Sequence, residues 1–227
     1  PSGLLDASDR NDRYAQLDLM RSLVVVHLRD DKVAEADALL REMDQLLARF
    51  PVVSLNHLVM AIHVAAHLYA GRVTEAKACL DERWAQCRSV GLHRFPLLRV
   101  TYTGMLADCI LADAARPAEQ RAAQLSALAK TTRKEPLAWA GALTAQLEGR
   151  AALLLHKPPV AQRALSEAQE RYTARGMSLP AAAMRHLAAE CAAPRRADEL
   201  RSEARTFFAE QGIAKPERFL AIVNTIY

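Results

Sequence analysis

Turn signals divide this sequence into a regular succession of helical stretches, and no segment shows the sustained apolar/polar alternation of a strand. Five prolines lie near predicted first helical turns, where a fixed φ and a missing N–H are tolerated: Pro96, Pro117, Pro136, Pro180 and Pro216. Three glycines precede an aliphatic residue just past a predicted helix end, as in a left-handed C-cap: Gly91, Gly176 and Gly212. The chain is therefore predicted to be all-α.

The predicted helices fall into pairs. They cover residues 12–28 and 32–50, 54–69 and 73–90, 96–114 and 117–132, 136–155 and 160–175, and 178–192 and 195–211, and a short helix follows from Pro216. Ala, Leu and Arg dominate the composition and aromatic residues make up only 5%, which favours helices packed closely on Ala and Leu. We expect about five helical hairpins and a C-terminal closing helix.

Internal repeats support this arrangement. Residues 33–36 (Val-Ala-Glu-Ala) recur as residues 73–76 (Val-Thr-Glu-Ala), and residues 158–176 align with residues 194–212. Because one hairpin cannot bury its apolar stripe alone, stacked hairpins are expected to form an α/α superhelix with a concave face. Trp84 lies on such a stripe and is expected in the core.

Length and composition indicate one domain. Residues 12–227 are predicted to form a single helical-repeat domain, while residues 1–11, which begin without Met, read as a flexible start or an expression-vector scar on a piece of a longer protein. No apolar run approaches the ~20 residues that span a bilayer. The four cysteines, Cys79, Cys87, Cys109 and Cys191, lack the paired spacing of a zinc or redox motif. These features favour reduced thiols and a cytoplasmic location.

The net charge of +4 raises the question of nucleic acid. Residues 116–227 carry a net charge of +6 and residues 1–115 a net charge of −2, but the basic residues are interleaved with Glu. A solvated helical surface accounts for this pattern better than a track for phosphates does. Neither nucleic acid nor a membrane is expected as a partner.

Catalytic motifs are absent from the sequence. It contains no phosphate-binding or dinucleotide-binding Gly loop, no His-Glu-x-x-His, no Gly-x-Ser-x-Gly and no His-Arg-Asp. We therefore expect neither enzymatic activity nor a cofactor, although an active site assembled from dispersed residues remains an alternative.

Two segments resemble known proteins. Residues 68–76 (Leu-Tyr-Ala-Gly-Arg-Val-Thr-Glu-Ala) resemble the helix-turn-helix junction of tetratricopeptide (TPR) repeats. Residues 207–219, with Gln-Gly-Ile-x-x-Pro-Glu-Arg, resemble the C-terminal close of large bacterial signalling proteins that join a serine/threonine kinase to an AAA-type ATPase and a long TPR tail. The resemblance implies a TPR-like sensor or scaffold tail, with neither kinase nor ATPase in this chain.

Candidate binding residues come from the first helix of each pair, which lines the concave surface in TPR-like folds. His63 and His67 lie four residues apart on one helix face at the border of its apolar stripe. This spacing can hold a metal if other ligands join it, but a hydrogen bond to a neighbouring helix or a place in the groove is favoured, and no metal is predicted.

Two further helices supply the other candidates. Trp139, Gln146 and Arg150 share one flank of a helix, and small residues occupy a different flank, at Gly141, Ala145, Gly149 and Ala152. Trp139 could equally fill the core of the next repeat. Arg99 and Tyr102 cluster with Asp113, where an Arg–Asp surface pair competes with a groove role.

The predicted function is a non-catalytic scaffold for protein interaction or ligand sensing, in the regulatory TPR-like tail of a larger bacterial signalling protein. Its partner is expected to be a protein or peptide, including neighbouring domains of the parent chain, bound through aromatic and Arg anchors. Two alternatives remain. One is the effector or partner-sensing tail of a transcriptional regulator with a separate DNA-binding domain, and the other is a stand-alone enzyme with a dispersed site.

Overall fold

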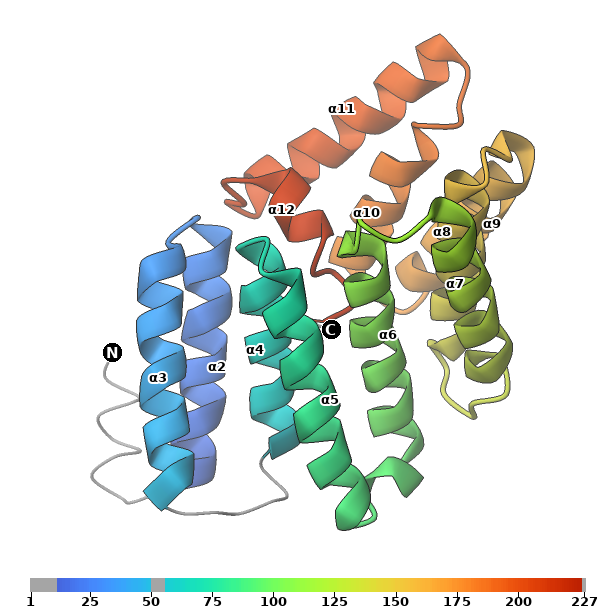
Figure 1. Ribbon diagram of the computed structural model, residues 1–227. Coiled ribbons are helices and arrows are strands. Elements are labelled where there is room, and N and C mark those ends of the chain that lie inside the picture. The colour runs from blue at the N-terminus through green and yellow to red at the C-terminus, as the bar shows by residue number, and fades with distance from the viewer. Residues whose placement is uncertain (1–11, 50–55, 226–227) are drawn as a thin grey trace.

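The computed structural model describes residues 12–49 and 56–225, and this part of the chain is helical without a strand (Figure 1). Within these residues, eleven α-helices follow one another, with one 3-10 turn at Leu92–Arg94: α2 (Arg13–Arg29), α3 (Val33–Arg49), α4 (Asn56–Tyr69), α5 (Val73–Ser89), α6 (Pro96–Ala112), α7 (Ala118–Thr132), α8 (Ala140–Leu154), α9 (Pro158–Thr173), α10 (Ser178–Ala188), α11 (Pro194–Glu210) and α12 (Pro216–Leu220). The all-α prediction is confirmed. The predicted flexible start at residues 1–11 lies outside the described residues.

Most predicted helix boundaries agree with the structure to within two residues, and the largest differences have local causes. The helix predicted from Pro136 begins only at Ala140. Both carboxylate oxygens of Glu135 are bound by Arg99, which fixes the turn before Pro136, and residues 136–139 lie outside the helix. The helix predicted to reach residue 192 ends at Ala188, and residues 189–192 form turns that lead to Pro194.

The same turn joins the two helices of three hairpins. Asp31, Gly71 and His156 each take a positive φ, of 59°, 75° and 53°. The residue that follows donates its backbone N–H to a carbonyl in the last turn of the preceding helix at 2.8–2.9 Å. Gly91, Gly176 and Gly212 also have positive φ, as their predicted C-cap role requires.

Helices pack mainly against their neighbours in the sequence, on small and aliphatic side chains. Ala36 and Ala76, at equivalent places in the repeated segments, are fully buried, and Trp84 is buried on the same stripe as Leu80 and Cys87. The predicted close approach along the small flank of α8 is confirmed: a Cβ at Gly149 would lie 2.7 Å from Cγ of Leu165 on α9.

The two ends of the array meet. Helix α11 crosses the top of the array from the side of α9 and α10 towards α2 (Figure 1). Met20 and Val24 of α2 share one hydrophobic cluster with Ala204 and Phe208 of α11. Beyond α11, the Ala214 N–H donates to the Arg29 carbonyl at 2.8 Å. The first and last hairpins are therefore in direct contact.

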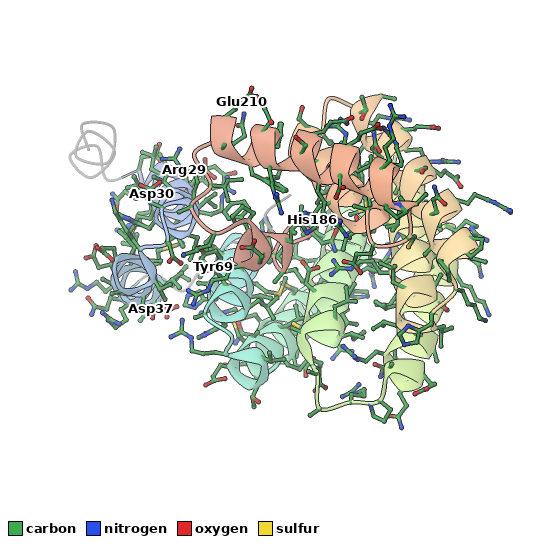
Figure 2. The ribbon with its side chains drawn as sticks, turned by 90° about the horizontal axis from the view of Figure 1, so that it is seen from above. Arg29, Asp30, Asp37, Tyr69, His186 and Glu210 are labelled. Atoms are coloured by element: carbon green, nitrogen blue, oxygen red, sulfur yellow. The ribbon has the colours of Figure 1, made fainter. Side chains whose placement is uncertain are left out.

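The chain then turns into the space that the hairpins surround. We call residues 216–225, which comprise α12 and the turns after it, the closing segment. Seen from above, α12 lies among the surrounding helices, close to Tyr69 (Figure 2). The Phe219 ring meets the Tyr69 ring edge-on with centroids 6.4 Å apart, and the Arg218 Nη1 lies 3.1 Å from an Asp31 carboxylate oxygen.

Two glycines of α8 provide a matched test of this packing. Gly149→Ala should lower the free energy of unfolding by about 1–3 kcal/mol, because the new methyl collides with the buried Leu165. Gly141→Ala should leave stability unchanged or raise it by up to about 1 kcal/mol, since its methyl meets only the flexible end of Arg171 and Ala favours the helix. Urea unfolding followed by circular dichroism measures both. Equal shifts would contradict the close α8–α9 contact.

Candidate functional site

The inner side of α6 carries a carboxylate in apolar surroundings. Asp108 is 1% exposed and lies in the buried, largely aliphatic second half of this helix. One turn earlier, Gly104 lies against the closing segment, where a Cβ would be only 3.0 Å from the Asn224 carbonyl oxygen. The glycine thus lets the backbone of the closing segment approach α6 at the level of Asp108.

Among the described residues, three hydrogen bonds reach Asp108, and all three come from the closing segment. Its Oδ2 accepts from the Asn224 backbone N–H at 3.1 Å and from the Thr225 hydroxyl at 3.0 Å, and its Oδ1 accepts from the Asn224 side-chain amide at 2.7 Å. A buried carboxylate needs such donors, because hydrogen bonds to a charged group offset part of its lost hydration.

The nearest cation is Arg150 on α8, whose Nη1 lies 4.0 Å from Asp108 Oδ1. At this distance the pair interacts mainly by charge. Burial raises the pKa of Asp108 to about 7, although Arg150 and the hydrogen bonds from Asn224 and Thr225 act in the opposite direction. Burial likewise lowers the pKa of Arg150.

A second polar chain orients the Asn224 amide. The Tyr172 hydroxyl donates to Gln146 Oε1 at 2.7 Å, and Gln146 Nε2 donates to Asn224 Oδ1 at 2.8 Å. Both ends of the Asn224 amide are therefore hydrogen-bonded: its oxygen accepts from Gln146, and its nitrogen donates to Asp108. We call this group the polar anchor; its members are Asp108, Gln146, Arg150, Tyr172, Asn224 and Thr225.

Apolar contacts surround the polar anchor. Phe219, Ile222 and Val223 of the closing segment are at most 3% exposed, and they join the hydrophobic clusters built by the hairpins. A cavity beside Asn224, lined by Trp139 and Tyr172 among others, has a volume of about 10 Å³. That is space for one water molecule at most.

Three of the seven residues predicted from the sequence lie at this site. Gln146 and Arg150 belong to the polar anchor, and Trp139 lines the small cavity beside it. Trp139 is partly buried and packs against the hydrophobic cluster around Leu143, so it combines a core position with contact to the site.

Arg99 and Tyr102 lie elsewhere on α6 and have other partners. Arg99 binds both Glu135 carboxylate oxygens, at 2.7 and 2.6 Å, and the predicted Arg99–Asp113 surface pair is wrong because Asp113 pairs with Arg116 at 3.2 Å. Tyr102 stacks on Trp84 with ring centroids 4.2 Å apart.

His63 and His67 face the preceding hairpin. His63 is buried with its Nε2 3.2 Å from Asp44 Oδ1 on α3, so it contacts a neighbouring helix, although the pair does not have the geometry of the predicted hydrogen bond. The two rings lie 6.2 Å apart, and burial and the charge of Arg72 lower the pKa of His67. Within residues 12–49 and 56–225, no three His, Cys, Asp or Glu side chains are grouped to hold a metal.

Sequence analysis missed four residues of the polar anchor: Asp108, Tyr172, Asn224 and Thr225. Asp108 had a detectable signal, since it is the one charged residue of the otherwise apolar stretch 104–112. A lone carboxylate in a buried stretch needs a partner. Asp108 and Asn224 are 116 positions apart, so no local pattern identifies that partner.

A larger hollow lies between the start of α5 and the end of α6, with a volume of about 590 Å³. Its charged side chains neutralise one another, since Lys77 contacts Asp81 and Arg116 contacts Asp113. Because these charged groups are already paired, this hollow is a weaker candidate for a binding site than the polar anchor.

No family model, curated protein or solved structure matches the chain. No helix among the described residues is long and apolar enough to cross a membrane. The four cysteines are free thiols.

The raised pKa of Asp108 predicts a specific pH dependence of stability. The folded state holds the proton up to about pH 7, whereas an unfolded Asp loses it near pH ~4, so the free energy of unfolding should fall as pH rises between these values. The Asp108→Asn variant lacks this contribution. We expect the stability of the wild type relative to Asp108→Asn to fall by about 1–2 kcal/mol between pH 5 and pH 7.

Urea unfolding at several pH values measures this difference, and other titrating groups cancel because both proteins contain them. Asp198→Asn is the matched control, since the Asp198 side chain is 81% exposed on α11. A constant difference between wild type and Asp108→Asn over this pH range would contradict the prediction.

Proposed function

We propose that the chain is a non-catalytic interaction module that binds a protein or peptide segment on the inner face of its first helices. The inner face is the surface of α4, α6 and α8 that the closing segment covers, from Tyr69 through Gly104 and Asp108 to Gln146. One observation carries the proposal: this face already holds the non-helical stretch 221–225 through its backbone and side chains. A surface that binds one peptide segment in this way has the chemistry to bind another.

The same site favours binding over catalysis. Every oxygen of Asp108 is occupied by donors of the closing segment, and the adjoining cavity holds about 10 Å³. A general acid or base must reach a proton on a substrate, and a buried carboxylate sealed under a peptide segment does not.

For the wider context, we propose that the hairpins wind as a right-handed TPR-like superhelix and serve as the regulatory region of a larger bacterial signalling protein in the cytoplasm. The hairpin succession and the resemblance of residues 207–219 to the tails of kinase–ATPase proteins support this proposal. A neighbouring domain of the parent chain then becomes a natural source of the bound segment.

A displayed library of random peptides tests the binding function. The library is selected on the immobilised chain and, in parallel, on an Asn224→Ala variant whose inner face is easier to reach. We expect peptides that bind with dissociation constants below about 100 μM (on the order of 5 kcal/mol) and that lose at least tenfold in affinity on Asp108→Ala.

Asp198→Ala on the exposed side of α11 serves as the control and should leave the selected peptides bound. The proposal fails if neither protein yields a peptide whose binding depends on Asp108.

A further inference from the structure

We propose that the closing segment is a displaceable internal ligand, and that the partner is a peptide segment with the same recognition pattern. This pattern is an aromatic residue, apolar residues three and four positions later, and then Asn-Thr, as in Phe219, Ile222, Val223, Asn224 and Thr225. The inference rests on the proposed function, because it names the partner and the regulation of the same inner face.

On the inner face, Asp108 supplies hydrogen-bond acceptors and Gln146 supplies a donor, and the closing segment provides the partners of both. The hydrogen bonds that reach Asp108 come from Asn224 and Thr225, and the Gln146 amide nitrogen donates to Asn224. Without the closing segment, Asp108 and Gln146 would lose these bonds, and Arg150 at 4.0 Å would be the charged neighbour left to Asp108. A face with this composition needs an occupant, and an external segment that supplies the same groups satisfies it equally.

Upstream of the buried residues Phe219, Ile222 and Val223, the attachment of the closing segment rests on few contacts. Helix α12 has five residues, too few to be stable without tertiary contacts. Upstream, it is tied to the first hairpin by the Ala214–Arg29 backbone hydrogen bond and by the partly exposed Arg218–Asp31 pair, and an ion pair of that kind contributes about 0–1 kcal/mol. Release of residues 216–225 leaves the hairpins' own pairings intact.

Asn224 sets the specificity of the site. Its amide nitrogen donates to the Asp108 carboxylate while its oxygen accepts from Gln146 Nε2. The site therefore requires both a donor and an acceptor at this position. Asp at this position would place a second carboxylate against Asp108, and Ala would leave Asp108 and Gln146 short of partners. Sites that bind a polar group in this way reject analogues that lack it far more strongly than an apolar pocket does.

Covalent connection makes the closing segment a strong competitor. A tethered segment has an effective concentration in the mM range, so a free peptide of the same sequence should bind the intact chain only weakly. Weakening the internal copy while keeping Asp108 and Gln146 should therefore expose a site for the free peptide.

The experiment uses the full chain and a fluorescent peptide with the sequence of residues 214–227. The Asn224→Ala/Thr225→Ala double variant should bind the peptide at least tenfold more tightly than the wild type does, as measured by fluorescence anisotropy. Glu217→Ala, an exposed change within the same segment, should bind as weakly as the wild type. A peptide with Ala in place of Asn224 should lose at least tenfold in affinity for the double variant.

Equal binding to wild type and double variant, or no binding to either, overturns the inference. It also fails if the Ala-substituted peptide binds as well as the original. Binders from the random library that do not compete with this peptide would retain the proposed function while rejecting the internal-ligand assignment.

Hydrogen exchange of the wild type tests the same inference without a variant. Amides of residues 219–225 should exchange by local opening at least tenfold faster than the central amides of α8, after correction for their intrinsic rates. Equal protection of the two segments would show that the closing segment leaves only on global unfolding, and the inference would then be wrong.

Discussion

The burial of one carboxylate organises the centre of this molecule. Asp108 lies in an apolar environment where an uncompensated charge would be prohibitive, and its hydrogen bonds all come from a segment more than a hundred residues away. Gly104 has no side chain to obstruct that segment, and Gln146 fixes the amide that approaches it. The hydrogen bonds that compensate the buried carboxylate therefore link the closing segment to α6, α8 and α9.

This requirement separates the chain from a simple repeat array. In an open array each hairpin contacts only its neighbours, and its stability is a sum of local terms. Here Ala204 and Phe208 of α11 share a cluster with α2, and the closing segment reaches α4, α6 and α8. The inner face, which an open superhelix would leave free for partners, is already covered.

The sequence predicted the helices well because their determinants are local. Turn glycines such as Gly176 and Gly212 and helix-initiating prolines such as Pro96 act within a few residues, and the small flank of α8 around Gly149 packs against the next helix in the sequence. The start of α8 was misplaced because Arg99, 36 residues away, holds the preceding turn through Glu135.

The site was predicted only in part, for the same reason. Gln146 and Arg150 share a face of α8 that periodicity could identify, whereas Asn224 becomes important only through the folded path of the chain. Stacking of Tyr102 on Trp84 and the contact of His63 with Asp44 likewise depend on which helices become neighbours.

The contact between Asp31 and Arg218 joins residues 187 positions apart, and it bears on how the protein is made. During synthesis the hairpins emerge in order and can fold one after another on local contacts. The inner face is then uncovered until residues 216–225 have left the ribosome. Asp108 lacks the donors of Asn224 and Thr225 during that interval, so a partner present during translation would meet a face that residues 216–225 later cover.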